Sequence, residues 1–231
     1  DAYINVSMDE AFDKEGPMKT RKSLKVVAFV LLVAFLTPGV ASAIEFSDRE
    51  IEKLQAGKTV KKPLSTSGKN GFYGGTGWAI INAPVEVVWE ALKDLAAYPT
   101  MFPQTVSTKE VARKGDKSLV QMELGYKILS VGYYLNVVED PSQKKISFKL
   151  VSSKPHDIDD TSGYWRLFPQ PDGRTLVGYV VAVQVPKGIT VFLGDSMERT
   201  LERCVIGLPK YLKKWVESPQ GNRYRTMTAK K

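Results

Sequence analysis

The chain is poor in the residues that build covalent and metal-held frameworks. Its 231 residues include one cysteine, Cys204, and one histidine, His156. A disulfide within the chain needs a second cysteine, and a structural zinc site needs about four cysteine or histidine ligands, so the sequence excludes both. It therefore predicts a fold held by an ordinary hydrophobic core, which a chain of this length is long enough to bury.

Long apolar stretches are also scarce. The longest unbroken one, residues 26–36, has eleven residues, whereas a membrane-spanning helix needs roughly 20. A basic segment, residues 19–25, precedes this run, and Pro38 and the small residues Ala41-Ser42-Ala43 follow it. This order is typical of a secretory signal peptide over residues 18–43, and residues 1–17 are interpreted as an over-extended start. We expect cleavage near Ala43 and a periplasmic or secreted protein; the alternative is an uncleaved N-terminal anchor.

Acidic residues are fewer than basic ones, 25 against 33, so the net charge is +8. Aromatic residues fall inside apparent strands and not among basic clusters, which argues against nucleic acid as a partner. Lys210, Lys213 and Lys214 gather at the end of the last predicted helix. Cations are favourable at any helix C-terminus, but this group also predicts transient contact with an anionic membrane surface.

Most of the chain after residue 71 alternates apolar and polar residues between turn signals, which predicts an antiparallel sheet. The expected strands are residues 72–82, 104–113, 117–125, 127–138, 145–151, 161–169 and 175–185, with short helices at 84–92 and 94–98 between the first two strands. Before them, Ser47 and Glu50 form a capping pattern for a short helix that Gly57 ends. Residues 58–70 resemble a linker or a loose edge.

The longest helical pattern covers residues 190–217 and closes a predicted domain over residues 71–217, after which residues 218–231 read as a basic polar tail. Apolar positions in the helix recur every three or four residues and form one stripe, which must be buried against another part of the molecule. Pro209 predicts a bend near Gly207. The sequence thus predicts an α+β fold, in which a curved seven-stranded antiparallel sheet surrounds a long C-terminal helix.

The first expected strand is unusually rich in glycine, at positions 71, 74, 75 and 77. A phosphate-binding loop would follow a strand and lead into a helix through Gly-Lys-Ser/Thr, and this segment does neither. Glycine inside a strand marks a bulge or the close approach of another element, and we expect the same here.

Two segments resemble a known superfamily. Residues 81–103, INAPVEVVWEALKDLAAYPTMFP, and Gly163-Tyr164-Trp165-Arg166-Leu167 are similar to the opening and to a later strand of START-like (SRPBCC) proteins. That superfamily includes Bet v 1-type helix-grip proteins, the polyketide cyclase/dehydrase family and coenzyme-Q-binding START-like proteins. The resemblance implies a helix-grip fold that holds a lipid or other hydrophobic small molecule between its sheet and its C-terminal helix.

The resemblance also implies which residues line the cavity, although by periodicity alone they would be plain core. The expected ligand-binding residues lie on the strands, at the entrance and on the C-terminal helix: Trp78, Met122, Leu124, Tyr133, Phe148, Trp165 and Tyr179; Tyr98 and Phe102; Met197, Leu201, Val205 and Leu208.

No catalytic residue, metal ligand or cofactor is predicted. The segment His156–Asp160 could bind a hard cation, but we interpret it as a solvated loop, since aspartate favours exposed turns. The alternative function is a cyclase or dehydratase that uses the same cavity, with Glu123, Arg166 or Tyr133 as its polar groups. A third hypothesis, a protein-interaction module, predicts an exposed apolar patch instead of a pocket.

Overall fold

The computed structural model describes residues 45–65, 72–126, 129–186 and 205–229. The predicted signal peptide and residues 1–17 lie outside the described residues, as does the 190–204 part of the predicted long helix, with Met197, Leu201 and Cys204. The elements from Phe46 onward form one unit. No helix in the described part of the chain is long and apolar enough to cross a membrane.

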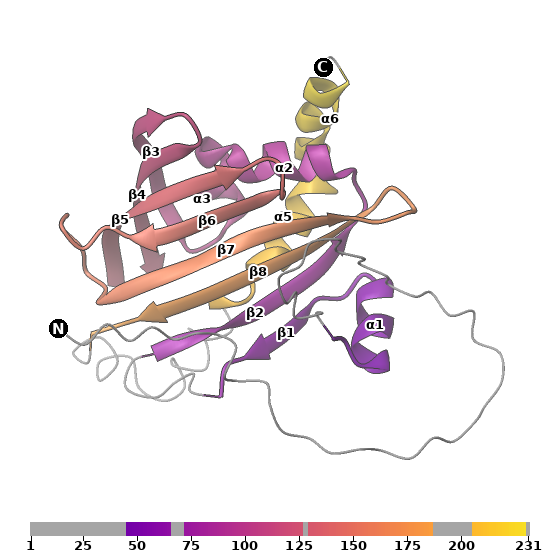
Figure 1. Cartoon of the computed structure of the whole chain (residues 1–231), viewed down its shortest axis with the longest axis horizontal. Coiled ribbons are helices and arrows are strands. Elements are labelled where there is room, and N and C mark those ends of the chain that lie inside the picture. Colours follow the sequence, from indigo (N-terminus) through magenta and orange to yellow (C-terminus); the bar gives the residue numbers. More distant parts are fainter. Residues whose placement is uncertain (1–44, 66–71, 127–128, 187–204, 230–231) are drawn as a thin grey trace. The chain divides into compact units, whose positions relative to one another are not determined.

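An eight-stranded antiparallel sheet forms most of this unit (Figure 1). The strands lie in the order β1-β2-β8-β7-β6-β5-β4-β3, and every neighbouring pair is antiparallel. Their bounds are β1 Val60–Pro63, β2 Phe72–Ile81, β3 Thr105–Lys114, β4 Lys117–Tyr126, β5 Leu129–Asp140, β6 Lys145–Leu150, β7 Asp160–Pro169 and β8 Thr175–Gln184. The seven strands expected from the sequence are present, and their ends agree to within two residues.

The eighth strand, β1, corrects the expectation of seven strands, and of the two expectations for residues 58–70, a linker or a loose edge, residues 60–63 match the edge. It pairs with β2 at the edge of the sheet, with Val60 opposite Trp78. Four residues are too few to show a period-two pattern, and the lysines next to Val60 resemble a solvated linker. The strand forms because β2 offers an edge with free backbone groups and because Val60 is buried, at 4% exposure.

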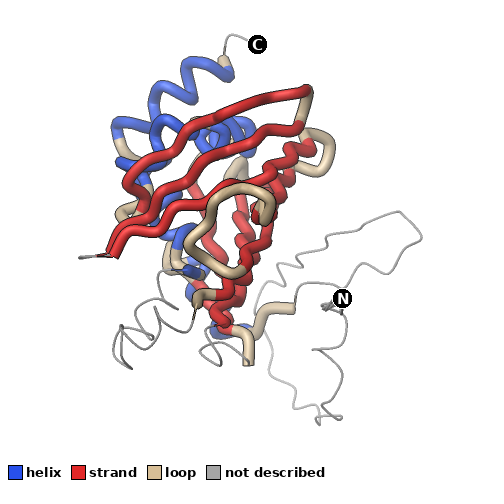
Figure 2. Tube along the Cα trace, turned by 90° about the vertical axis from the view of Figure 1, so that its left-hand side faces the viewer, coloured by secondary structure: helices blue, strands red, loops and turns tan. Residues whose placement is uncertain are grey.

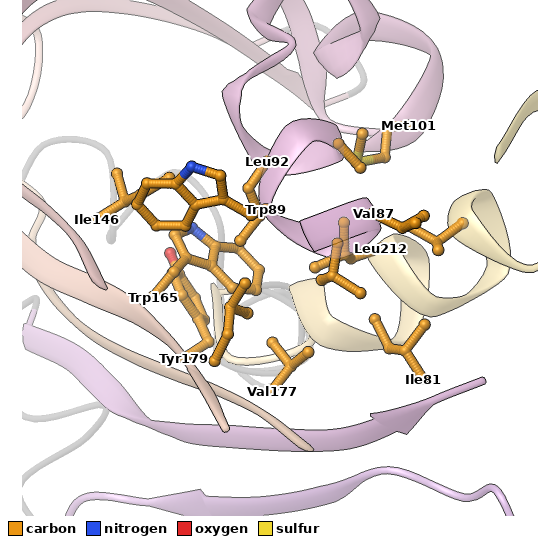
Figure 3. Packing of buried hydrophobic residues seen from close by; sticks show 14 of the residues in the cluster. Ile81, Val87, Trp89, Leu92, Met101, Ile146, Trp165, Val177, Tyr179 and Leu212 are labelled. Atoms are coloured by element: carbon orange, nitrogen blue, oxygen red, sulfur yellow. The ribbon is translucent and has the colours of Figure 1, made fainter. Parts of the chain in front are cut away.

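Helices pack on both faces of the sheet. The inner face carries α2 Val85–Lys93, the short helices η2 Leu95–Ala97 and α3 Tyr98–Met101, and α5 Leu208–Val216. Buried side chains of α2 and α5 meet those of the central strands in the main core (Figure 3). Figure 2 shows the strands bending around this group of helices.

On the outer face, α1 Asp48–Gln55 lies against β1 and β2. The predicted capping box is confirmed, since the Ser47 backbone N–H donates to Glu50 Oε2 at 2.9 Å. Gly57 follows the helix in the left-handed region, at φ +73°, as expected of a helix stop. Leu54 of α1 packs with Trp78, Phe168 and other apolar residues in a second, smaller core.

The C-terminal helix is interrupted where Pro209 predicts a bend. Val205 is helical, Ile206 and Gly207 form a turn, and α5 begins at Leu208 with Pro209 in its first turn. This start of α5 lies directly on β2, because a Cβ added at Gly77 would lie 2.3 Å from the Ile206 carbonyl oxygen. The expected close approach at the glycine-rich strand is therefore confirmed.

Residues 218–231, expected to be a polar tail, contain further structure. A turn at η3 Pro219–Gly221 leads into α6 Asn222–Thr228. Tyr224 of α6 is 1% exposed within the main core, and its hydroxyl donates to Asp94 Oδ2 at 2.8 Å. One aromatic residue in a basic segment gives no periodic signal, so the sequence pattern did not indicate this helix.

Candidate functional site

A cavity of about 250 Å³ lies between the inner face of the sheet and the helices. Side chains alternate across a strand, so every second residue of β4 and β5 faces it. From β4 these are Ser118, Val120, Met122 and Leu124, and from β5 Val131, Tyr133, Leu135, Val137 and Glu139. Most of the lining is apolar, which suits a hydrophobic occupant.

Ten of the thirteen expected ligand-binding residues line this cavity. They are Tyr98, Phe102, Met122, Leu124, Tyr133, Phe148, Trp165, Tyr179, Val205 and Leu208. Met197 and Leu201 lie outside the described residues. The role of the expected residues in binding a ligand stays a prediction, but the fold brings the ten together from seven elements, the residue after α3 and the helical Val205.

Trp78 is the exception, and its placement corrects the sequence expectation. It belongs to the outer core, where its ring contacts Phe46 edge-on at a centroid distance of 5.3 Å. On β2 the neighbouring Gly77 faces α5, so Trp78 must point to the opposite face. There it covers Gly178, where a Cβ would lie 2.3 Å from the indole.

Aromatic rings form one continuous wall of the cavity. Trp165 of β7 and Tyr179 of β8 are directly paired in register, and their ring centroids lie 4.2 Å apart. Phe102 stacks on Trp165, and Phe148 stacks on Tyr179, each at 6.2 Å. Figure 3 shows Trp165 and Tyr179 side by side beneath Trp89 and Ile146.

The Gly163-x-Trp165 motif has a steric role in this wall. A Cβ at Gly163 would lie 2.6 Å from Cζ of Phe148 and 2.2 Å from the Val180 carbonyl oxygen. The absent side chain therefore leaves the space that the Phe148 ring occupies. Phe148 can then reach Tyr179 across β7.

Three tyrosines place hydroxyl groups in this largely apolar lining. The Tyr98 hydroxyl donates to the Leu92 carbonyl oxygen at 2.6 Å, whereas Tyr133 and Tyr179 reach the cavity from β5 and β8. Burial raises the pKa of all three phenols, with a smaller contribution from Glu139 at Tyr98. All three are therefore neutral near pH 7, and each hydroxyl keeps a proton that it can donate.

Charged residues lie together at one part of the lining. Arg113 of β3 pairs with Glu139 at 2.9 Å and with Glu110 at 2.6 Å, and hydrogen bonds to these carboxylates raise its pKa. Glu139 and Arg113 both line the cavity and were missed from the sequence. Glu139 lies six residues after Tyr133 on β5, and residues an even number apart share one face of a strand. That alternation could have indicated Glu139 as a lining residue. On β3, the register shift between Glu110 and Ala112 interrupts the alternation of side chains. The sequence pattern therefore does not tell which face of the sheet Arg113 lies on.

The polar groups expected for the alternative enzyme do not gather in the cavity. Glu123 lies outside the lining and accepts hydrogen bonds from the hydroxyls of Ser107 and Ser130, each at 3.0 Å. Arg166 also lies outside it, over the Phe168 ring at 5.3 Å. Of the three residues, Tyr133 alone lines the cavity.

The loop that contains His156 is held by contacts between its side chains and backbone atoms. His156 Nδ1 lies 2.8 Å from the Ile158 carbonyl oxygen, and Asp157 Oδ2 accepts the Gly132 backbone N–H at 2.7 Å. Ile158 is 4% exposed and packs with Tyr133 in a third apolar cluster. These contacts fasten the loop to β5.

A family model described as polyketide cyclase/dehydrase and lipid transport matches residues 81–205, more than half of the chain. The granaticin polyketide synthase bifunctional cyclase/dehydratase of Streptomyces violaceoruber is 29% identical over 97 residues, which span 41% of this chain and 29% of that protein's length.

Solved structures share the fold at low identity. The Zhui aromatase/cyclase from Streptomyces sp. R1128 has a TM-score of 0.52 at 18% identity, covering 65% of this chain and 98% of its own. A STAR-related lipid transfer protein from Xanthomonas axonopodis has a TM-score of 0.51 at 13% identity, covering 70% and 93%. The START-like resemblance and the helix-grip fold expected from residues 81–103 are confirmed. With its curved sheet, its helix-covered cavity and the match over residues 81–205, the chain belongs to the polyketide cyclase/dehydrase and lipid transport family.

Proposed function

We propose that this protein binds and carries one hydrophobic small molecule in the cavity between its sheet and its C-terminal helix. The observation that carries the proposal is the largely apolar lining of a cavity of about 250 Å³. Small-molecule sites typically measure about 300–1,000 Å³, so the size favours a ligand with one ring system or one chain over a two-chain phospholipid.

The test is to purify the protein from its own host and to record its native mass spectrum before and after organic extraction. A bound apolar molecule of defined mass is the expected result, and extraction should remove it. If nothing copurifies and the emptied protein takes up no hydrophobic probe, the binding proposal fails.

We propose further that the protein acts outside the cytoplasm. This part is supported by the signal-peptide pattern over residues 18–43. Cell fractionation followed by N-terminal sequencing tests it: the expected mature protein begins at Ile44 in the exported fraction. Recovery of the chain in the cytoplasm with its N-terminal segment intact would contradict it.

Contact with an anionic membrane is also a proposal, and the structure narrows which lysines could make it. Lys213 points inward: its Nζ donates to the Ile80 carbonyl oxygen at 2.8 Å and pairs with Glu217 at 2.6 Å. Lys210 and Lys214 are exposed. Each well-placed cation contributes about 1 kcal/mol at an anionic surface.

Co-sedimentation with liposomes of neutral lipid and of neutral plus anionic lipid tests this contact. Binding should depend on the anionic lipid and should weaken in the double variant Lys210→Gln/Lys214→Gln. The matched control is Lys117→Gln, which removes an exposed lysine on β4. Equal binding to neutral and to anionic liposomes would contradict the proposal.

A cyclase or dehydratase is the second candidate, favoured by the similarity to the granaticin cyclase/dehydratase. A carrier releases its extracted ligand unchanged, whereas a dehydratase releases a product lighter by one water. Incubating the recovered molecule with fresh protein and comparing both its mass and its absorption spectrum distinguishes them, because ring closure without loss of water leaves the mass unchanged.

A further inference from the structure

Two phenol hydroxyls in the cavity lack a hydrogen-bond partner among the described residues. Tyr133 and Tyr179 are 8% and 5% exposed, and both line the cavity. The third cavity tyrosine, Tyr98, has its hydroxyl satisfied by the Leu92 carbonyl oxygen. Hydroxyls inside a protein normally have a hydrogen-bond partner, and both of these oxygen atoms border the open space of the cavity, where a bound molecule can supply one.

The surroundings of the two hydroxyls favour a ligand as the partner. Met122 lies opposite Tyr133 across β4 and β5, and Trp165 lies opposite Tyr179 across β7 and β8. Neither neighbour offers an acceptor oxygen. Burial raises the pKa of both phenols, and the nearby Tyr133 raises that of Tyr179 further, so both hydroxyls keep their proton and can donate a hydrogen bond to an acceptor on a ligand.

The wall of aromatic rings indicates what shape of ligand fits the cavity. The Tyr179 ring contacts the rings of both Trp165 and Phe148, and Phe102 extends the same wall. Rings packed against one another lose little further freedom when a ligand binds. Flat aromatic walls contact a flat ring system well, whereas an acyl chain presents neither a flat face nor, along its length, an acceptor.

We infer that the cavity takes a ring compound bearing a carbonyl or ether oxygen, to which Tyr133 and Tyr179 donate hydrogen bonds. The inference rests on the proposed function and specifies its ligand class. Apolar surface supplies the affinity, and the two hydroxyls select for the oxygen, because an all-carbon ligand would leave both donors buried and unsatisfied.

The test uses two naphthalene probes: the fluorescent ketone prodan, and ethylnaphthalene, a smaller hydrocarbon without an acceptor, each compared between the parent and the variants. Prodan binding is followed by fluorescence titration, and its emission moves to longer wavelength when its carbonyl accepts hydrogen bonds. Ethylnaphthalene is measured by its displacement of prodan. The variants are Tyr133→Phe, Tyr179→Phe and both together, since each removes one oxygen and keeps the ring.

Tyr134→Phe is the matched control. Tyr134 is the next residue of β5, points away from the cavity and has its ring under Lys154. We expect each cavity variant to weaken prodan binding about five- to tenfold and to shift its emission to shorter wavelength. Ethylnaphthalene affinity should change less than about twofold. The Tm of the cavity variants should equal or exceed that of the parent, because a hydroxyl without a protein partner is lost.

The outcomes separate this inference from the proposed function. If the parent binds both probes and the cavity variants bind prodan with unchanged affinity and emission, the oxygen-selective role is refuted and the cavity remains a hydrophobic site. If the parent binds neither probe, the proposed function fails, and the inference fails with it. A lower Tm in Tyr133→Phe or Tyr179→Phe would assign the hydroxyls a structural role and would also overturn the inference.

Discussion

Replacing Gly77 by alanine tests how closely the C-terminal helix sits on the sheet. Gly77 lies in β2, under the turn that precedes α5. A Cβ at this position would lie 2.3 Å from the Ile206 carbonyl oxygen and 3.2 Å from Cδ of Pro209. The first contact is with backbone, so no side-chain rotation can relieve it.

The cost follows from the required displacement. Ordinary contacts of a Cβ begin at 3.4 Å, so the Ile206 carbonyl and the start of α5 must retreat by about 1 Å. That movement loosens Leu212 and Val216, which α5 buries in the main core at 0% and 1% exposure. Overpacking costs about 1–3 kcal/mol, and the lower chain entropy of alanine in the unfolded state offsets about 0.4–1 kcal/mol.

We therefore expect Gly77→Ala to lose about 1–2 kcal/mol of unfolding free energy, or roughly 2–8 °C in Tm. Urea unfolding followed by circular dichroism measures the first quantity, and a thermal scan measures the second. Gly132→Ala is the control, because a Cβ there meets its nearest atom at an ordinary 3.6 Å. Equal stability of the two variants would refute the tight contact between β2 and the start of α5.

Three further predictions concern other parts of the structure. Tyr224→Phe removes the hydroxyl that donates to Asp94 at 2.8 Å, and urea unfolding should show a loss of about 1–3 kcal/mol; a neutral result would mean that α6 contributes nothing through this bond. Trp78→Ala should cost about 3–5 kcal/mol yet leave prodan affinity unchanged, because Trp78 lies in the outer core; weaker binding would contradict that placement. The folded pKa values of Tyr133 and Tyr179 are raised above the ordinary value near 10, so their contribution to stability is complete below about pH 10 and lost as the pH rises further. Spectrophotometric titration should show both ionising only as the protein unfolds, and early ionisation in the folded protein would count against their burial.

Strands were the most predictable part of this protein. Residues 145–151 and 175–185 alternate or run apolar between turn residues, and their observed bounds, β6 and β8, follow closely. The prediction fell short where a segment was short or polar. β1 has four residues, and α6 has one buried aromatic side chain in a basic stretch. Both depend on a partner that is distant in sequence: β2 for β1, and Asp94 with the main core for α6.

The sequence predicted most of the residues that line the candidate site, but it did not predict as well which face of the sheet each residue lies on. Alternation tells which residues of a strand share a face, but not which face meets the helices. Trp78 was therefore assigned to the cavity, although the contact of Gly77 with Ile206 turns it outward. The sequence pattern did not indicate Arg113 and Glu139, because charged residues usually point to solvent. Here the two side chains form an ion pair at the cavity lining, and each neutralises the charge of the other.

The sequence by itself determined the antiparallel strands, the short helices, the break at Pro209 and membership of the family through residues 81–103, because these depend on local periodicity and on residues close together in the chain. Only the tertiary structure decided that rings from β6, β7, β8 and the end of α3 form one wall, and that two tyrosine hydroxyls meet no protein partner there among the described residues. The physical reason is that register and facing are set by packing between distant segments, and that a cavity exists only where those segments leave space unfilled.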